Sequence, residues 1–208
     1  MAIFGNKAAI EYFYAAHSAY AYLGSRAFLN IAADAGRPIA HKPVDLRVLV
    51  DSVGSQPFKE RSDAHRAYFF GREIKRWSEF RHAPVMNGTP THHANGITRV
   101  NCMLIGADID GQSIDELAHT LLEAHWRDDA DLDDNASLER LAGTHGFDGK
   151  ALLKRSYADD VVAQYQANTA EAIARNVFGS PTYVVDGDPF YGQDRLEMVA
   201  RALHKPFI

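Results

Sequence analysis

Residues 178–195 read FGSPTYVVDGDPFYGQDR, a stretch that predicts two strands joined by a turn. Thr182–Val185 is β-branched and aromatic, as in a buried strand, and Asp186-Gly187 is the signal of a tight hairpin turn. Phe190-Tyr191 continues the return strand. The helix that follows, residues 193–204, carries on one face Leu196, Val199, Ala200 and Leu203. The end of the chain therefore predicts a β-β-α unit.

The start of the chain predicts a second unit of strands and a helix. Ala9–Ala16 (AIEYFYAA) is an aromatic and apolar run without a breaker, typical of a buried strand. Helical spacing begins at Ser18, and Gly36 followed by Pro38 ends that helix. Pro38–Leu46 is a second extended segment, which completes β-α-β.

The middle of the chain, from Pro57 to about Asn176, is predicted to be almost entirely helical. Ser113 with Glu116 is typical of a capping box at the start of one helix. The other helices are expected over residues 68–80, 135–146, 149–166 and 169–176. We find no internal repeat and no low-complexity linker.

The order β-α-β, helical block, β-β-α indicates an α/β protein with a thioredoxin fold and a large inserted all-helical domain. We expect residues 1–50 and 177–208 to form the thioredoxin-like domain and residues 51–176 to form the insertion. An all-helical protein would leave the strand signals at both ends unexplained.

The composition is that of an ordinary soluble protein, with 208 residues, 46% hydrophobic and 24% charged. The net charge of −5 and the scattered basic residues argue against nucleic acid and anionic membranes as partners. The uncharged stretch Tyr12–Ser25 is shorter than the about 20 residues that span a bilayer. We therefore expect a cytoplasmic protein without a membrane partner.

The chain has a single cysteine, Cys102. An intramolecular disulfide, a cysteine-rich metal module and a catalytic dithiol are thereby excluded. Cys102 has no feature that marks it as reactive and is interpreted as a small core residue.

The ten histidines suggest a metal site, but their spacing does not support one. No HExxH motif occurs, and the adjacent His92 and His93 should point apart. His119 and His125 are not aligned on a helix. We expect no bound metal.

Asp129, Asp131 and Asp133 resemble the start of a calcium loop. That loop needs Gly and Glu where this chain has Asp134 and Arg140. A solvated, helix-capping loop is the better interpretation.

Three segments are candidate ligand contacts, each with a structural alternative. At His17-Ser18-Ala19-Tyr20 a strand ends and a helix begins, so free backbone N–H groups and the helix dipole would stabilise an anion such as a thiolate. A simple N-cap at Ser18 explains the same pattern.

The second and third segments lie near the end of the chain. In a thioredoxin fold Pro181 would be a cis proline facing the first helix, and the backbone of Ser180 would pair with an extended peptide ligand. Tyr191–Arg195 opens the last helix, whose N–H groups would suit a carboxylate. Asp194 would there suit an ammonium group or simply cap the helix.

The segments FYAAHSAYAYLGSRA (13–27) and NVFGSPTYVVDGDPFYGQDRLEM (176–198) resemble 2-hydroxychromene-2-carboxylate isomerases. These are close relatives of kappa-class glutathione transferases and DsbA-type proteins. The similarity covers nearly the whole chain, including Arg76-Trp77 and LEAHWRDDADLDD (122–134). The motif near the end of the chain is the more specific of the two.

The resemblance implies glutathione as cofactor, a small aromatic substrate and a homodimer. It places Ser18 where DsbA-type proteins carry the first cysteine of Cys-Pro-x-Cys, and makes Ser18 the catalytic residue that hydrogen-bonds the glutathione thiol. It implies further glutathione contacts at Ser180, Tyr191, Gly192, Gln193 and Asp194. Arg66 stands where relatives carry lysine and would hold a carboxylate.

The family's reaction converts a cyclic hemiketal into trans-o-hydroxybenzylidenepyruvate. By hypothesis the glutathione thiolate adds to the conjugated carbon, the resulting single bond rotates, and elimination restores the trans alkene. The protein's part is to stabilise the thiolate over the thiol.

The chain departs from the family pattern mostly at the substrate end. Ala19 replaces the proline after the serine, and Gly54-Ser55 replaces a glycine-asparagine pair. Val50 and Asn95 stand where relatives carry a lysine and an aromatic residue. Two other hypotheses therefore stay open, a kappa-like glutathione S-transferase or peroxidase and a glutathione-binding protein without catalysis.

Overall fold

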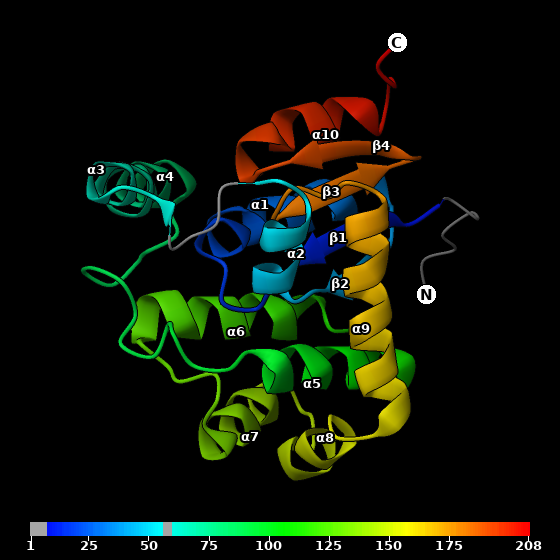
Figure 1. Ribbon diagram of the computed structural model, residues 1–208. Coiled ribbons are helices and arrows are strands. Elements are labelled where there is room, and N and C mark those ends of the chain that lie inside the picture. Colours follow the sequence, from blue (N-terminus) through cyan, green and yellow to red (C-terminus); the bar gives the residue numbers. More distant parts are fainter. Residues whose placement is uncertain (1–7, 56–59) are drawn as a thin grey trace.

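The computed structural model describes residues 8–55 and 60–208 and has a four-stranded mixed sheet at its centre (Figure 1). The strand order is β2-β1-β3-β4. The strands are β1 (Ile10–Tyr14), β2 (Ile39–Pro43), β3 (Thr182–Val185) and β4 (Asp188–Tyr191). Strand β1 pairs parallel with β2 and antiparallel with β3, and β3 pairs antiparallel with β4. The predicted thioredoxin fold is confirmed.

The sheet is covered by helices from both ends of the chain and from its middle. Helix α1 (Ala19–Ala35) begins at Ser18 and ends at Gly36, as expected, and packs beside α10 (Leu196–Ala202). The short 3₁₀ turn η3 (Gln193–Arg195) leads into α10. Helices α5 (Thr98–Ile109) and α9 (Asp159–Ala174) lie against β2 (Figure 1).

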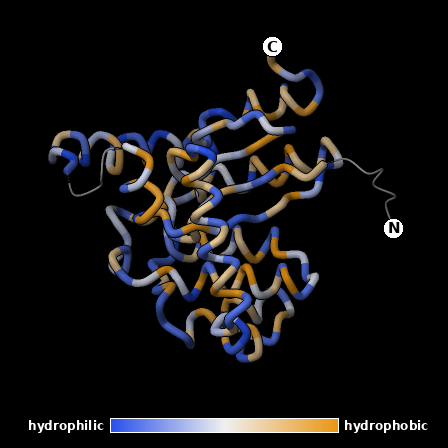
Figure 2. Tube along the Cα trace, turned by 45° about the vertical axis from the view of Figure 1, so that its right-hand side comes forward, coloured by the Kyte–Doolittle hydropathy of each residue, from blue (hydrophilic) through white to orange (hydrophobic). Residues whose placement is uncertain are grey.

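The remaining helices lie between β2 and β3 in the sequence. They are α2 (Leu46–Ser52), α3 (Asp63–Arg66), the π-helical turn η2 (Ala67–Arg72), α4 (Glu73–Arg81), α6 (Asp115–Asp128), α7 (Asn135–Gly143) and α8 (Gly149–Arg155). Figure 1 shows α3 and α4 to one side of the sheet and α7 and α8 at the end farthest from it. Figure 2 shows hydrophobic and hydrophilic positions alternating along these helices, as amphipathic helices require.

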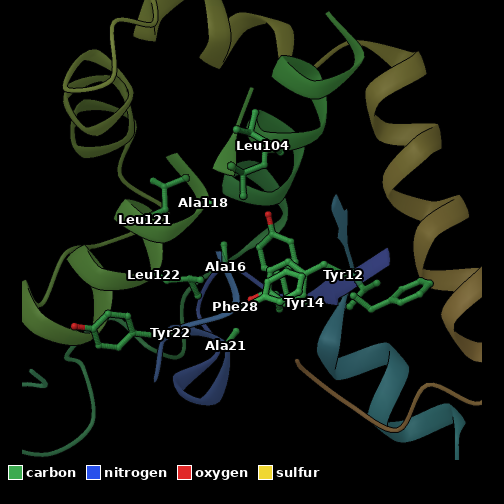
Figure 3. Close-up of a cluster of buried hydrophobic side chains, with 14 of the residues drawn as sticks. Tyr12, Tyr14, Ala16, Ala21, Tyr22, Phe28, Leu104, Ala118, Leu121 and Leu122 are labelled. Carbon is green, nitrogen blue, oxygen red and sulfur yellow. The ribbon is translucent and has the colours of Figure 1, made fainter. Parts of the chain in front are cut away.

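A continuous hydrophobic core joins the sheet to the helical middle of the chain. Figure 3 shows Tyr12, Tyr14 and Phe28, from β1 and α1, beside Leu104 of α5 and Leu121 of α6. These side chains are at most 2% exposed. Packing therefore ties the two parts of the chain together.

Several expected boundaries are wrong. The helix expected over residues 149–166 ends at Arg155, where the hydroxyl of Ser156 turns back to donate to the carbonyl of Leu153 at 2.6 Å. Helix α9 then starts afresh with Asp159 and Asp160, whose carboxylates suit a helix N-terminus, and it also includes most of the separate helix expected over 169–176.

The prediction that Ser113 and Glu116 form a capping box is also wrong. Helix α6 begins at Asp115 without a side-chain cap, and Glu116 pairs instead with Arg26 of α1 at 2.8 Å. A tertiary ion pair has replaced the local interaction.

Residues 82–97 form an irregular segment where a helix was expected. Both proline positions within it, Pro84 and Pro90, lack the N–H that a helix interior uses. The first strand is shorter than Ala9–Ala16, and Pro57, the expected start of the helical block, lies outside the described residues.

Candidate active site at the start of α1

Ser18 joins the start of α1 to the loop before β3. Its Oγ accepts a hydrogen bond from the backbone N–H of Ala21 at 3.3 Å and donates to the carbonyl oxygen of Ser180 at 3.2 Å. The Ser180–Pro181 peptide bond is cis, as expected from the fold. Ser18 is thus the N-cap of α1, and its hydroxyl also reaches the loop that precedes the cis proline.

Ser180 is held in place by its side chain. Its Oγ accepts a hydrogen bond from the backbone N–H of Ala15 at 3.1 Å, just beyond the end of β1. The backbone of Ser180 therefore lies next to the N-terminus of α1, in direct contact with Ser18.

The turn after β4 brings Tyr191, Gly192 and Asp194 to the same end of the sheet. The N–H of Gly192 donates to the carbonyl of Pro181 at 2.9 Å, so this N–H is already engaged. Gly192 has φ 102°, and a Cβ there would collide with the carboxylate of Asp194. Tyr191 is half-exposed and its ring packs beside Phe178, while partial burial raises the pKa of its hydroxyl.

Gln193 lies inside the protein and is 1% exposed. Its side-chain oxygen and its backbone oxygen accept hydrogen bonds from Nε and Nη2 of Arg81, both at 3.1 Å. Arg81 also pairs with Glu197 of α10 at 2.8 Å. The sequence reasoning missed Arg81, because no local pattern links α4 to a turn more than a hundred positions later.

Arg66 and the helices around it lie to one side of the sheet. Arg66 pairs with Asp63 on α3 at 3.2 Å, and about half of its side chain is exposed. The hydroxyl of Tyr20, in the first turn of α1, donates to the carbonyl of Phe69 at 2.6 Å and so connects α1 to η2.

The positions that depart from the family pattern have structural partners. Val50 is 3% exposed and packs in the core. Ser55 donates to the carbonyl of Phe178 at 3.2 Å, and the side chain of Asn95 donates to Asp131 at 3.0 Å. Ala19 is buried in the first turn of α1.

Three histidines meet next to Ser18, a grouping that the sequence does not predict although His17 belongs to the first candidate segment. His17, His93 and His125 form a continuous row of rings, with 5.0 Å between the ring centroids of the first pair and 5.3 Å for the second. His92 turns away toward Asp131, so the adjacent pair of histidines does diverge. Within the described ranges, no three His, Cys, Asp or Glu side chains are arranged to hold a metal ion.

The remaining candidates agree with structural roles. Asp134 caps α7 by accepting from the N–H of Ser137, and Asp129 binds Thr91. Cys102 is fully buried in α5, and burial raises the pKa of its thiol. The acidic residues therefore cap a helix and hold neighbouring segments, and the cysteine is a core residue.

The comparison with protein families agrees with this geometry. The profile of the DsbA-like thioredoxin domain matches residues 9–204. The chain belongs to the DsbA-like thioredoxin family. None of the helices in residues 8–55 and 60–208 has the length and apolar character needed to cross a bilayer.

Similar proteins within this family include isomerases. A 2-hydroxychromene-2-carboxylate isomerase of Pseudomonas sp. (strain C18) is 23% identical over 194 residues, covering 93% of this chain and 89% of the relative. One from Sphingobium xenophagum is 23% identical over 190 residues, covering 91% of this chain and 95% of the relative.

Solved structures show the same fold. A 2-hydroxychromene-2-carboxylate isomerase aligns with a TM-score of 0.75 at 20% identity over 93% of both chains. The cytosolic disulfide reductase DsbM from Pseudomonas aeruginosa with GSH aligns with a TM-score of 0.64 at 12% identity, covering 95% of this chain and 93% of that one. The resemblance drawn from the two sequence motifs is confirmed.

Proposed function

We propose that the chain is a glutathione-dependent cis-trans isomerase. It interconverts 2-hydroxychromene-2-carboxylate and trans-o-hydroxybenzylidenepyruvate, or a close aromatic analogue, in aromatic hydrocarbon catabolism. The observation that carries the proposal is the contact of the Ser18 hydroxyl with the carbonyl of Ser180, at the start of α1 and beside a cis proline. The names of the curated relatives support the reaction.

Glutathione supplies the reactive sulfur in this proposal, since the chain's only cysteine is buried in α5. Its cysteinyl backbone would lie along Ser180, and its γ-glutamyl end would meet the turn at Tyr191, Gly192 and Asp194. Gln193 would contribute its backbone, because its side chain is bonded to Arg81. The DsbM structure with GSH supports a glutathione site on this fold.

The Ser18 hydroxyl would turn from Ser180 to the glutathione sulfur. A hydroxyl donor and the N-terminus of α1 both favour thiolate over thiol, which lowers the pKa of the bound thiol. Glutathione bound there would supply a thiolate nucleophile, which is the chemistry needed to lower the barrier to rotation about a conjugated double bond. The part of Ser18 and of the N-terminus of α1 would be to hold that sulfur and keep it deprotonated.

The wider organisation is part of the same proposal. We take residues 1–50 and 177–208 as a thioredoxin-like domain and 51–176 as its helical insertion. The enzyme acts as a cytoplasmic homodimer on a small aromatic carboxylate, and Arg66 holds a carboxylate of the substrate or of glutathione.

A spectrophotometric assay on 2-hydroxychromene-2-carboxylate, with and without glutathione, tests the proposal. We expect turnover only with glutathione, and a glutathione concentration that stays constant by thiol titration. Consumption of glutathione would instead indicate the transferase or peroxidase. Glutathione binding without turnover on this substrate would reduce the protein to a binding module and contradict the proposal.

A further inference from the structure

The histidine row behind Ser18 is built from three distant parts of the chain. His17 precedes Ser18, His93 lies in the irregular segment between α4 and α5, and His125 lies in α6. Nδ1 of His93 and Nε2 of His125 are 2.9 Å apart. The three rings therefore form one polar group that starts at the residue next to the proposed catalytic serine.

The hydrogen bonds fix which nitrogen of His93 is basic. Nδ1 of His125 is 2.9 Å from the carbonyl oxygen of Ala130, which can only accept, so this Nδ1 carries a proton. In the neutral ring, Nε2 of His125 then accepts, and His93 must donate from Nδ1. The lone pair of His93 is thereby placed on Nε2.

The surroundings keep these rings neutral and fixed. Burial and the neighbouring histidine lower the pKa of His93 to about 4, and burial also lowers the pKa of His125. The ring N–H of Trp126 donates to the carbonyl of His17 at 2.8 Å, and the indole packs edge-on against His93 with 5.2 Å between ring centroids.

His17 adds a further polar atom to the same group. It is 6% exposed, and its Nδ1 has no hydrogen-bond partner within the described residues. Such a nitrogen is unusual in a folded protein, where most buried polar atoms are hydrogen-bonded.

We propose that His93 is the acid–base residue of the isomerisation, with His125 as the positioning residue that directs its lone pair. This inference rests on the proposed isomerase function. Nε2 of His93 takes the proton of the hemiketal hydroxyl, and the O–H electron pair forms the new C=O bond. The bond from that carbon to the ring oxygen breaks, and the oxygen, leaving as phenolate, takes the proton back from His93. The net result is the transfer of one proton from the hemiketal oxygen to the phenol oxygen, and no co-reactant is needed.

The step opens the ring and prepares the conjugated ketone to which the thiolate adds. A protonated His93 is a strong acid in this environment, which favours return of the proton to the phenolate. The side chain of Arg47, held by the carbonyls of His93, Ala94 and Asn95, adds a positive charge beside the rings. The other charged or titratable groups facing the row are Asp129, Asp131 and His92.

The test compares H93Q with H204Q, a control at an exposed histidine near the end of the chain, in the glutathione-dependent assay. H93Q should lower kcat about 100-fold, as expected for loss of an acid–base group, while KM and the Kd of glutathione by calorimetry change less than threefold. H204Q should keep the wild-type kcat. In H93G, added imidazole should restore turnover, which a structural defect would not allow.

A second measurement does not depend on activity. In ¹⁵N NMR of the wild-type protein at pH 7, His93 Nε2 should be unprotonated and Nδ1 protonated, and H125Q should abolish this preference. An Nε2-protonated His93, or a kcat for H93Q within threefold of wild type, would overturn the inference and leave the isomerase proposal intact. A wild-type protein without glutathione-dependent turnover would overturn both.

Discussion

At the scale of single residues, Ser18 shows how one side chain satisfies two requirements. Its Oγ completes the backbone hydrogen bonding of α1, and the same oxygen donates across to Ser180. A hydroxyl can both accept and donate, which neither alanine nor a carboxylate can match. The cap and the proposed catalytic contact are therefore properties of the same atom.

Replacing Ser18 with alanine should remove both roles, and each has its own measurement. We expect S18A to lower kcat about 100-fold while glutathione still binds, and to lower the free energy of unfolding by about 1 kcal/mol through loss of the cap. The control is S62A, which removes the N-cap hydrogen bond of α3 to His65. S62A should leave kcat unchanged; an S18A enzyme at the wild-type rate would remove Ser18 from the mechanism.

Arg81 supports the turn that carries Asp194, and its removal tests whether that turn determines glutathione affinity. R81M deletes two hydrogen bonds to Gln193 and the ion pair with Glu197, so the turn that carries Asp194 loses its support. We expect the Kd of glutathione, measured by calorimetry, to rise about tenfold, since losing hydrogen bonds from a charged group costs about 1.5–3 kcal/mol.

The matched control for Arg81 lies on the same helix. Arg76 is exposed and pairs only with its own helix neighbour Glu73 among the ion pairs of the described chain. R76M should leave glutathione affinity unchanged. An equal rise in the Kd of glutathione for R76M and R81M would show that the contact of Arg81 with the turn does not determine the affinity.

At the scale of elements, the site depends on how closely α1 approaches the turn before α10. Gly24 lies in the middle of α1, and a Cβ at this position would come within 2.5 Å of the Cβ of Gln193. The absence of a side chain lets α1 and η3 touch. That contact packs α1 against the turn that carries Asp194.

G24A should therefore destabilise the protein, although alanine ordinarily favours an exposed helix by about 1 kcal/mol. We expect the free energy of unfolding in urea to fall by about 1–3 kcal/mol, because overpacking must move either α1 or Gln193. Glutathione affinity should fall with it. G71A makes a fitting control, since a Cβ at Gly71 in η2 would meet nothing within 4 Å. A more stable G24A protein would contradict the close packing.

At the scale of the whole molecule, the continuous core makes the sheet and the helical middle depend on each other. Four histidines are removed from solvent by this packing. His17 and His125 are buried, and His93 and His119 are partly buried. Their folded-state pKa values lie below the ordinary value of 6.5, at about 4 for both His93 and His119. Folding is therefore linked to pH.

The stability of the protein should be greatest above pH 7 and fall between about pH 6.5 and 4. In that range the unfolded chain binds protons on histidines that remain neutral in the folded state. We expect about 2 kcal/mol lost from pH 7 to pH 5 for each of His93 and His119, measured by urea unfolding followed by circular dichroism. H119Q should show a shallower dependence than the wild type, and equal stability at pH 5 and pH 7 would contradict the linkage.

Much of the fold and part of the site could be predicted from the sequence, because those features are local. Strand patterns, the Asp186-Gly187 turn and the Ser18 cap each depend on residues a few positions apart. The absence of a dithiol follows from counting one cysteine. The motifs around Ser18 and Ser180 also indicated the family that the profile match confirms.

Contacts between residues that are far apart in the sequence could be seen only in the tertiary structure. The pairing of Arg81 with Gln193, the row of His17, His93 and His125, and the ion pair that replaced the Ser113 capping box all join separate segments. A local pattern carries no information about such contacts, since their energy comes from packing that brings the segments together. For the same reason the count of one cysteine could be read from the sequence, while only the fold revealed that the imidazole next to Ser18 begins a row of three.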